Sequence, residues 1–326
     1  MGQDEHDLFE WNLVDSLSNL PDRLAPTAWS GHISFLFSLF RIARPRSFVE
    51  LGVYNGASFI AACTAARIYE TETICFGIDT WQGDEHAGDY SESGDSIFCD
   101  LKSFLSENYQ FAKLIRSTFD SALNDFADGT IDMLHIDGMH TYEAVKGDFE
   151  SWLPKMSSRG IVLFHDTSVR ERNFGVWRFW EEVTEEYPSM EFFHSFGLGV
   201  LLVGRDQVSS MSVLIQRWNE SVSFKEFFRA TCEGFGALVP DRVQARENIN
   251  RIRWLESDRQ QKEVALRELQ HLREIDRIEK EAQFESLRHL QEVELLVENL
   301  TRRSRLYKLL RPILLLGHGF RELEKR

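Results

Sequence analysis

The pattern of apolar and polar positions changes character along the chain. In the N-terminal part, short apolar runs alternate with segments whose apolar residues recur every three or four positions, which predicts strands alternating with helices. The expected strands lie at 48–51, 74–78, 112–115, 131–136 and 160–164, followed by two late runs around Gly197 that could pair antiparallel. This order predicts an α/β fold with a doubly wound, Rossmann-like sheet of seven mostly parallel strands.

Helical segments are expected ahead of these strands and between them. Ser30 is placed to cap a helix that Pro45 stops, and further helices are predicted at 100–108 and 141–153. Residues 81–100 are acidic, rich in Gly and Ser, and without a period. Such a long segment inside a compact domain is either a functional lid or a solvated surface loop.

Toward the C-terminus the pattern becomes that of one long helix. Residues 243–303 contain no Pro or Gly, and leucines recur three apart at Leu266, Leu269 and Leu272. The pattern could form a coiled coil, although it is irregular and acidic residues fall near the seam. The tail, 304–326, is basic and apolar, so it could lie as an amphipathic helix on an anionic membrane surface or pack on a partner.

Composition narrows the class of protein. The chain has 326 residues, 43% of them apolar and 12% aromatic, which is enough for a sizeable core. A net charge of −15 argues against a nucleic-acid partner. The four cysteines lack metal-type or paired spacing and are expected to be buried thiols. Neither a signal peptide nor a run of transmembrane length is recognisable, so the expected location is the cytoplasm.

The first expected strand leads into a glycine-rich turn, within the sequence SFVELGVYNGASF (47–59). Glu50 precedes this turn, and Gly52 and Gly56 bracket it, so that backbone amides and a helix N-terminus can approach a ligand. The four-residue spacing of the glycines differs from the three-glycine pattern of dinucleotide-binding turns. An NAD-linked oxidoreductase is therefore the least favoured interpretation.

The strands are expected to end in polar residues, at the edge of the sheet where open α/β folds bind ligands. These residues are Glu50, Asp79, Ser117-Thr118-Phe119, Asp137 with His140, and His165-Asp166. A sheet that served only as a scaffold would not gather carboxylates there, because like charges repel and burial penalises them. Asp79 is placed to accept hydrogen bonds from the ribose hydroxyls of an adenosine cofactor, although it could also be a loop acid or an N-cap.

Asp137 and Asp166 are expected at the ends of adjacent strands, where their carboxylates could converge. With His165 or His140 they could bind a hard divalent cation such as Mg²⁺ or Mn²⁺, which would make a bound hydroxyl easier to deprotonate. His140 is also the preferred general base, because the ordinary pKa of histidine is near neutrality. The alternatives are structural: Asp137 could cap helix 141–153, and His165 could be a hydrogen-bonded core residue.

Several of these stretches together resemble a known family. HIDGMHTYEAVKGDFESWLP (135–154) and GIVLFHDT (160–167) are similar to motifs of a branch of bacterial class I S-adenosylmethionine-dependent methyltransferases. AWSGHISF, FVELGVYNGAS, GIDTWQGDEHAGDY and RERNFGVWRFWEE extend the resemblance over about residues 25–204. The branch includes relatives of the macrocin O-methyltransferases and the cephalosporin-hydroxylase-like proteins. The expected division is an N-terminal helical lid (1–30), a class I methyltransferase domain (31–240), a long helix (241–303) and a basic amphipathic tail (304–326).

The resemblance also implies roles for individual residues. Those expected to bind S-adenosylmethionine are Glu50, Gly52 and Gly56 at the methionine end, Asp79 at the ribose, and Ser117, Thr118 and Phe119 at the adenine. Metal-dependent relatives carry an acid where Asp137 stands and an acid–acid or acid–Asn pair where His165 and Asp166 stand, so His165 departs from their pattern. His140 stands where catechol-type relatives carry a lysine, which supports its role as a base beside Asp137.

The resemblance therefore implies an S-adenosylmethionine-dependent O-methyltransferase that acts on a hydroxyl of a small molecule or glycan, with a sugar as the favoured acceptor and a divalent metal as an optional aid. It also implies a place in polysaccharide biosynthesis near the inner membrane face. The long helix is expected to join copies of the chain into a homo-oligomer. The alternatives are a hydroxylase-like relative with the same fold, or an assembly protein that works through a C-terminal coiled coil.

Overall fold

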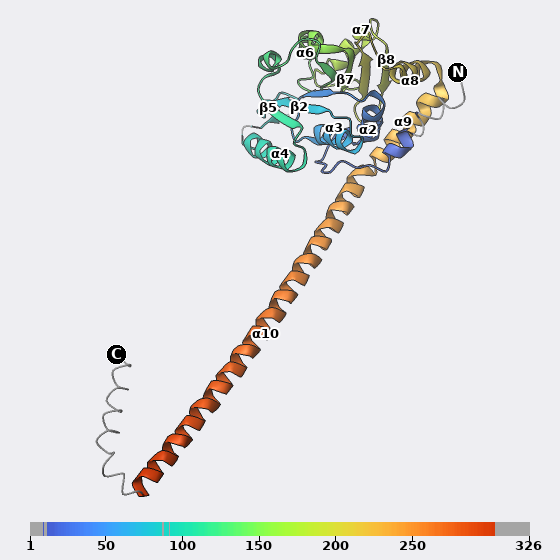
Figure 1. The fold of residues 1–326 in the computed structure, drawn as a ribbon. Coiled ribbons are helices and arrows are strands. Elements are labelled where there is room, and N and C mark those ends of the chain that lie inside the picture. The colour runs from blue at the N-terminus through green and yellow to red at the C-terminus, as the bar shows by residue number, and fades with distance from the viewer. Residues whose placement is uncertain (1–8, 10–11, 87, 91, 304–326) are drawn as a thin grey trace. The chain divides into compact units, whose positions relative to one another are not determined.

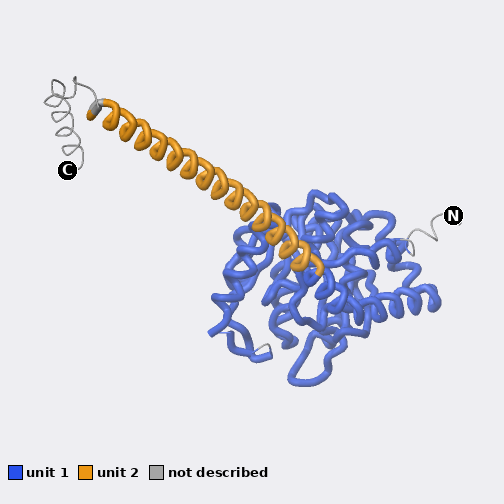
Figure 2. Tube along the Cα trace, turned by 90° about the horizontal axis from the view of Figure 1, so that it is seen from below, with its two compact units in different colours: residues 1–248 blue, residues 249–326 orange. Residues whose placement is uncertain are grey.

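The computed structural model describes residues 9, 12–86, 88–90 and 92–303, and the chain divides into two compact units. Unit 1 comprises residues 1–248 and unit 2 comprises residues 249–326 (Figure 2). Unit 1 therefore continues a short way past the boundary expected at residue 240. The expected tail, 304–326, lies outside the described residues, and the four-part division stays a prediction.

Seven strands form the main sheet of unit 1. They are β1 (Ser47–Leu51), β2 (Ile74–Asp79), β5 (Ala112–Arg116), β6 (Ile131–Ile136), β7 (Met156–His165), β8 (Ser189–Phe192) and β9 (Leu198–Leu202). Their order in space is β5-β2-β1-β6-β7-β9-β8. β9 runs antiparallel to both β7 and β8, and the other neighbouring strands are parallel. The doubly wound, mostly parallel sheet is confirmed, including the late antiparallel pair.

Helices cover both faces of this sheet (Figure 1). One face packs against α2 (Ile33–Ala43), α3 (Ala57–Ile68), α8 (Ser209–Glu220) and α9 (Val222–Gly236). The other face packs against α6 (Tyr142–Trp152) and α7 (Val176–Val183). The remaining short elements are β3 (Gly83–Asp84), β4 (Gly88–Asp89), α5 (Phe119–Ala122), η2 (Leu123–Asp125) and η3 (Leu153–Lys155).

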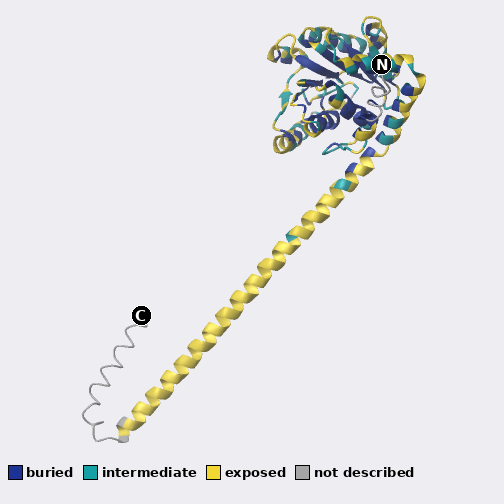
Figure 3. Ribbon diagram, turned by 45° about the vertical axis from the view of Figure 1, so that its right-hand side comes forward, coloured by how far each residue is buried: buried dark blue, intermediate teal, exposed yellow. Residues whose placement is uncertain are grey.

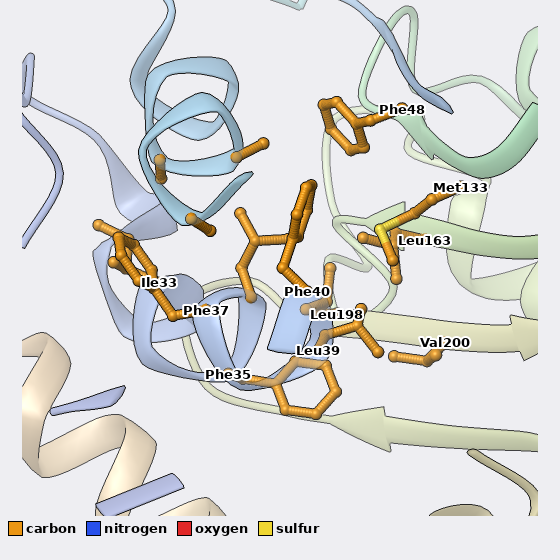
Figure 4. Close-up of a cluster of buried hydrophobic side chains, with 14 of the residues drawn as sticks. Ile33, Phe35, Phe37, Leu39, Phe40, Phe48, Met133, Leu163, Leu198 and Val200 are labelled. Carbon is orange, nitrogen blue, oxygen red and sulfur yellow. The ribbon is translucent and has the colours of Figure 1, made fainter. Parts of the chain in front are cut away.

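The alternation of side chains along the strands supplies a hydrophobic core on each face. Phe48 of β1 and Met133 of β6 lie in the first core, where Phe40 of α2 packs among the same side chains (Figure 4). Their chain neighbours Val49 and Leu134 point the other way and lie in the second core. Because both faces are buried, the strands read as continuous apolar runs, which is the pattern that marked them in the sequence.

The structure differs from the expectation ahead of two helices, α2 and the helix expected at 100–108. A 3₁₀ turn, η1 (Ala28–His32), precedes α2, and the Thr27 hydroxyl caps this turn by accepting a hydrogen bond from the Trp29 amide at 3.0 Å. The N-cap residue of α2 is His32, which makes no side-chain capping bond, so Ser30 is not the cap of that helix. The segment 81–100 is not structureless, because it contains the β3–β4 hairpin and the first turns of α4 (Gly94–Asn108).

Two further expectations are corrected, and two helices of the structure had not been predicted. Thr141 caps α6 by accepting a hydrogen bond from the Ala144 amide at 3.3 Å, so Asp137 is not the cap of that helix. Helices α8 and α9, which follow the sheet, were not predicted. Cys99 is exposed, whereas the other three cysteines are buried as expected.

The long helix is confirmed as α10 (Val239–Arg303). Within unit 2, which begins at Ile249, its large apolar side chains are exposed (Figure 3). Coiled-coil pairing stays a prediction. In the part of the chain that the structure describes, no helix combines the length and the apolar character needed to cross a membrane.

Candidate active site

A cavity of about 800 Å³ opens at the carboxyl ends of the central strands. The strand order reverses between β1 and β6, which is where open α/β sheets bind their ligands. The predicted site residues that line the cavity are Gly52, Asp79, Thr118, Phe119, Asp137, His140, His165 and Asp166. Residues that the sequence had placed only at strand ends are thus brought around one space.

The glycine-rich turn after β1 is fixed by the carboxylate of Asp79. One carboxylate oxygen accepts hydrogen bonds from the amides of Val53 and Tyr54, at 2.9 and 2.8 Å, and the other accepts from the Trp81 amide at 2.7 Å. Tyr54 has a left-handed backbone, with a φ of 47°. Since a carboxylate can accept about four hydrogen bonds, Asp79 keeps capacity for a ligand hydroxyl after it has shaped the turn.

Close approach of the strand ends explains the first glycine of that turn. Gly52 has a φ of 92°, and a Cβ placed there would lie 2.0 Å from the carbonyl oxygen of Asp137. A side chain would therefore push apart the ends of β1 and β6. Beside them, a Cβ at Gly138 would lie 2.4 Å from the ring of Phe119. The backbone itself forms this part of the cavity floor.

Three residues predicted to touch the cofactor do not line the cavity: Glu50, Gly56 and Ser117. Glu50 is fully buried, where one carboxylate oxygen accepts a hydrogen bond from the Ser58 hydroxyl at 2.8 Å and the other lies 3.3 Å from Nδ1 of His135. Burial raises the pKa of Glu50, and His135 opposes that rise. Glu50 therefore supports the turn from behind, and its direct contact with a cofactor stays a prediction.

Asp137, His140, His165 and Asp166 form a cluster that we call the acid–imidazole centre. Nε2 of His140 donates to a carboxylate oxygen of Asp166 at 2.8 Å and lies 3.6 Å from one of Asp137. Nδ1 of His165 lies 3.2 Å from Asp137 and 3.4 Å from Asp166. The predicted convergence of the ends of β6 and β7 is thus present, with each carboxylate facing both imidazoles.

Burial disfavours every charged form in this centre, but attraction between opposite charges outweighs it. The pKa of Asp137 is held well below its ordinary range by His165 and His140, and the same neighbours lower the pKa of Asp166. The carboxylates in turn raise the pKa of His140 to about 9, and that of His165 well above its ordinary value. These interactions favour the protonated form of both imidazoles, whereas the sequence had led us to expect a near-neutral pKa for His140.

The donor set of the centre fits a hard divalent cation. One ligand atom from each of Asp137, His140 and Asp166 can be chosen so that all lie within 4.8 Å of one another. Two carboxylates and an imidazole suit Mg²⁺ or Mn²⁺. The sequence had offered His165 or His140 as the third ligand, and this trio contains His140. Nε2 of His165 faces instead the carbonyl oxygen of Ser195 at 3.1 Å.

An aromatic wall beside the centre was missed in the sequence. The ring of Phe174 stacks on His140, with centroids 4.6 Å apart and planes 12° apart. The ring of His86 lies 4.5 Å from Phe174, and its Nε2 donates to the carbonyl oxygen of Arg172 at 2.8 Å. This bond ties the segment before β4 to the loop before α7 across the cavity. Both residues lie in stretches that carried the family resemblance, which was the available signal.

The fold and the site define a Rossmann-like domain with a ligand cavity at its strand ends, and comparison with known proteins agrees. Residues 49–167 match the family model of the methyltransferase domain. This segment runs from β1 to the residue after Asp166, so it spans the glycine-rich turn, Asp79 and the acid–imidazole centre. Over these residues unit 1 is thus similar to a methyltransferase domain.

Individual proteins are similar over a comparable part of the chain. An uncharacterised protein of Sinorhizobium fredii, y4gI, is 44% identical over 188 residues, which are 58% of this chain and 20% of that protein. The match thus spans a fifth of the length of that curated relative. A proposed caffeoyl-CoA O-methyltransferase from Staphylococcus aureus is 16% identical, with 62% of this chain and 93% of that chain covered and a TM-score of 0.43. A Podospora anserina methyltransferase, PaMTH1, bound to S-adenosylhomocysteine (SAH), is 15% identical, with 62% of this chain and 88% of that chain covered and a TM-score of 0.42.

Proposed function

We propose that the chain transfers a methyl group from S-adenosylmethionine to a hydroxyl of a small molecule or glycan, with a sugar as the favoured acceptor. The observation that carries this proposal is the convergence of Asp79 and the acid–imidazole centre on one cavity in a unit that is similar to a methyltransferase domain. Asp79 has the remaining hydrogen-bonding capacity to hold a ribose, and the centre offers charged groups to a reacting hydroxyl. A cavity of about 800 Å³ is within the range that encloses small-molecule ligands.

The chain's own residues would act mainly by positioning. Gly52 leaves the floor free of side chains, Asp79 would orient the nucleoside, and Phe119 offers an aromatic surface for the adenine. The acceptor hydroxyl would lie against the acid–imidazole centre, where His140 in its neutral form takes the hydroxyl proton as the oxygen bonds to the methyl carbon and the carbon–sulfur bond breaks, which releases S-adenosylhomocysteine. Because Asp137 and Asp166 raise the pKa of His140 to about 9, this neutral form becomes more abundant as the pH rises. Correct orientation of the two reactants supplies much of the rate in such a transfer.

A divalent cation at Asp137, His140 and Asp166 would lower the pKa of a bound hydroxyl when present. His140 could then no longer keep the proton that it shares with the two acids, because a metal ligand must be deprotonated. Binding of the cation would therefore be coupled to loss of the proton from His140.

Calorimetric titration tests the proposal. Wild type should bind SAH and S-adenosylmethionine but not NAD, and Asp79→Ala and Asp79→Asn should weaken binding at least about tenfold, the usual effect of losing hydrogen bonds to a charged group. Asp95→Ala is the matched control, because this acid is 83% exposed, pairs with Arg116 and does not line the cavity. Failure of wild type to bind either sulfur nucleotide would refute the proposed activity.

The exposed apolar residues of α10 favour a second role in self-association. Leu266, Leu269 and Leu272 are each more than half exposed, which a helix rarely tolerates without a partner. We propose a second copy of the chain as that partner, in line with the predicted homo-oligomer. Its test is the mass of the full chain by light scattering.

A further inference from the structure

The turn between β8 and β9 has an unusual backbone at the edge of the cavity. Ser195 and Phe196 have φ values of 52° and 69°, and Gly197 follows with 95°. The left-handed region favours glycine, and a bulky residue such as phenylalanine is an outlier there. Residues held in such conformations cluster at functional sites, where the surrounding structure fixes them.

Hydrogen bonds from several elements hold this turn in place. The carbonyl oxygen of Ser195 lies 3.1 Å from Nε2 of His165 and 3.3 Å from Nε2 of His32, and because a carbonyl only accepts, these nitrogens are the donors. The Phe196 carbonyl accepts from the Ser168 amide at 2.9 Å, and the Gly197 carbonyl accepts from the Asp166 amide at 3.1 Å. The turn is therefore tied directly to His165 and Asp166 of the acid–imidazole centre.

The result of this arrangement is an exposed phenylalanine among the residues that line the cavity. Phe196 lines the cavity although its side chain is 55% exposed. Phe193, on the same turn, is 62% exposed but does not line the cavity. The fold alone does not explain why residue 196 is a phenylalanine. A glycine would adopt the left-handed backbone without strain, and an exposed phenylalanine buries little apolar surface within the protein.

We propose that Phe196 is an acceptor-binding residue whose ring packs against the apolar C–H face of a sugar ring. A pyranose has such a face beside a polar edge of hydroxyls, and it therefore needs one flat apolar surface and a few polar groups, which is the composition of small-molecule sites. Phe196 supplies the surface, and the acid–imidazole centre, to which its turn is bonded, supplies polar groups for the hydroxyl edge. The inference rests on the proposed methyl transfer to a sugar hydroxyl.

Saturation-transfer NMR on SAH-saturated protein tests this, with methyl β-D-glucopyranoside, sorbitol and catechol as separate probes at millimolar concentration. The glucoside ring protons should receive saturation from wild type, Phe193→Ala and Phe196→Tyr, and should lose most of it with Phe196→Ala. Sorbitol has hydroxyls without a ring face and should give little signal. Binding of catechol without the glucoside, an unaltered signal with Phe196→Ala, or an equal loss with Phe193→Ala would overturn the proposal.

Phe196→Asn separates the role of the ring from damage to the turn. Asparagine tolerates the left-handed region, so this variant should melt as high as wild type or about 2–4 °C higher while it loses the glucoside signal. A lower melting temperature together with retained glucoside binding would contradict the account of the turn. SAH affinity, measured in parallel, should be unchanged in all these variants. Failure of wild type to bind SAH would refute the proposed methyltransferase activity, whereas the glucoside signal tests Phe196 separately.

Discussion

Asp148 offers a quantitative test of the electrostatics around the sheet. It lies on α6, within a stretch that carried the family resemblance, yet it does not line the cavity. Burial, and secondarily the charge of Asp120, raises its pKa from an ordinary 3.8 to about 7. Replacement by asparagine keeps the size of the side chain and removes the ionisation.

The direction in which Asp148 changes the free energy of unfolding depends on its pKa in the folded and unfolded chains. Well below the ordinary pKa of 3.8 the carboxyl of Asp148 is protonated in both states and has no effect on stability. As the pH rises toward 7, the unfolded chain loses the proton first, so unfolding is favoured, and above 7 the effect is constant. About three pKa units at 1.36 kcal/mol each give an upper value of about 4 kcal/mol, and partial solvent screening reduces it to about 2–4 kcal/mol.

Denaturant unfolding of wild type and Asp148→Asn between pH 4 and pH 8 measures this difference. The variant should be more stable at pH 8 by about 2–4 kcal/mol and within about 0.5 kcal/mol of wild type at pH 4. Asp120→Asn should recover a smaller part, because burial is the larger cause, and Glu150→Gln, on an exposed side chain of the same helix, should change stability by less than about 0.5 kcal/mol. A stability difference between wild type and Asp148→Asn that is independent of pH would refute the reasoning.

Three further predictions concern the site, a helix cap and the second unit. Asp137→Asn should lower methyl transfer by about 10²–10⁴ with SAH affinity nearly unchanged, because it disrupts the acid–imidazole centre alone; a radiolabel transfer assay and calorimetry check this. Thr141→Ala should lower the free energy of unfolding by about 1 kcal/mol through loss of the α6 cap, seen in the denaturant midpoint. Deletion of 249–326 should leave the melting temperature of unit 1 unchanged and should reduce the mass seen by light scattering to that of a monomer.

The parts that could be predicted from the sequence are those that local rules determine. Parallel strands end at one edge of a sheet, so carboxylates at the ends of two neighbouring strands must approach each other, as Asp137 and Asp166 do. The missed helix α8 had the same kind of signal, because Met211, Leu214 and Trp218 recur at helical spacing and are buried.

Other features depend on contacts between segments that are distant in the sequence, and these could not be predicted from the sequence. Asp79 accepts hydrogen bonds from three backbone amides because the turn after β1 lies against the end of β2. The backbone of Phe196 depends on imidazoles that η1 and β7 contribute from elsewhere in the chain. Neither the residue type nor its neighbours in sequence carry that information.

The acid–imidazole centre also changes the argument that first suggested a metal. Gathered carboxylates need a compensating positive charge, and a divalent cation is one source of it. The imidazoles of His140 and His165 are another source, because the two acids raise their pKa values, and in their protonated form they would balance Asp137 and Asp166 charge for charge. The carboxylate oxygens that a cation would need are the ones that face these imidazole nitrogens, so a cation that binds Asp137, His140 and Asp166 must displace any proton on the ligating nitrogen of His140, and its affinity should rise with pH.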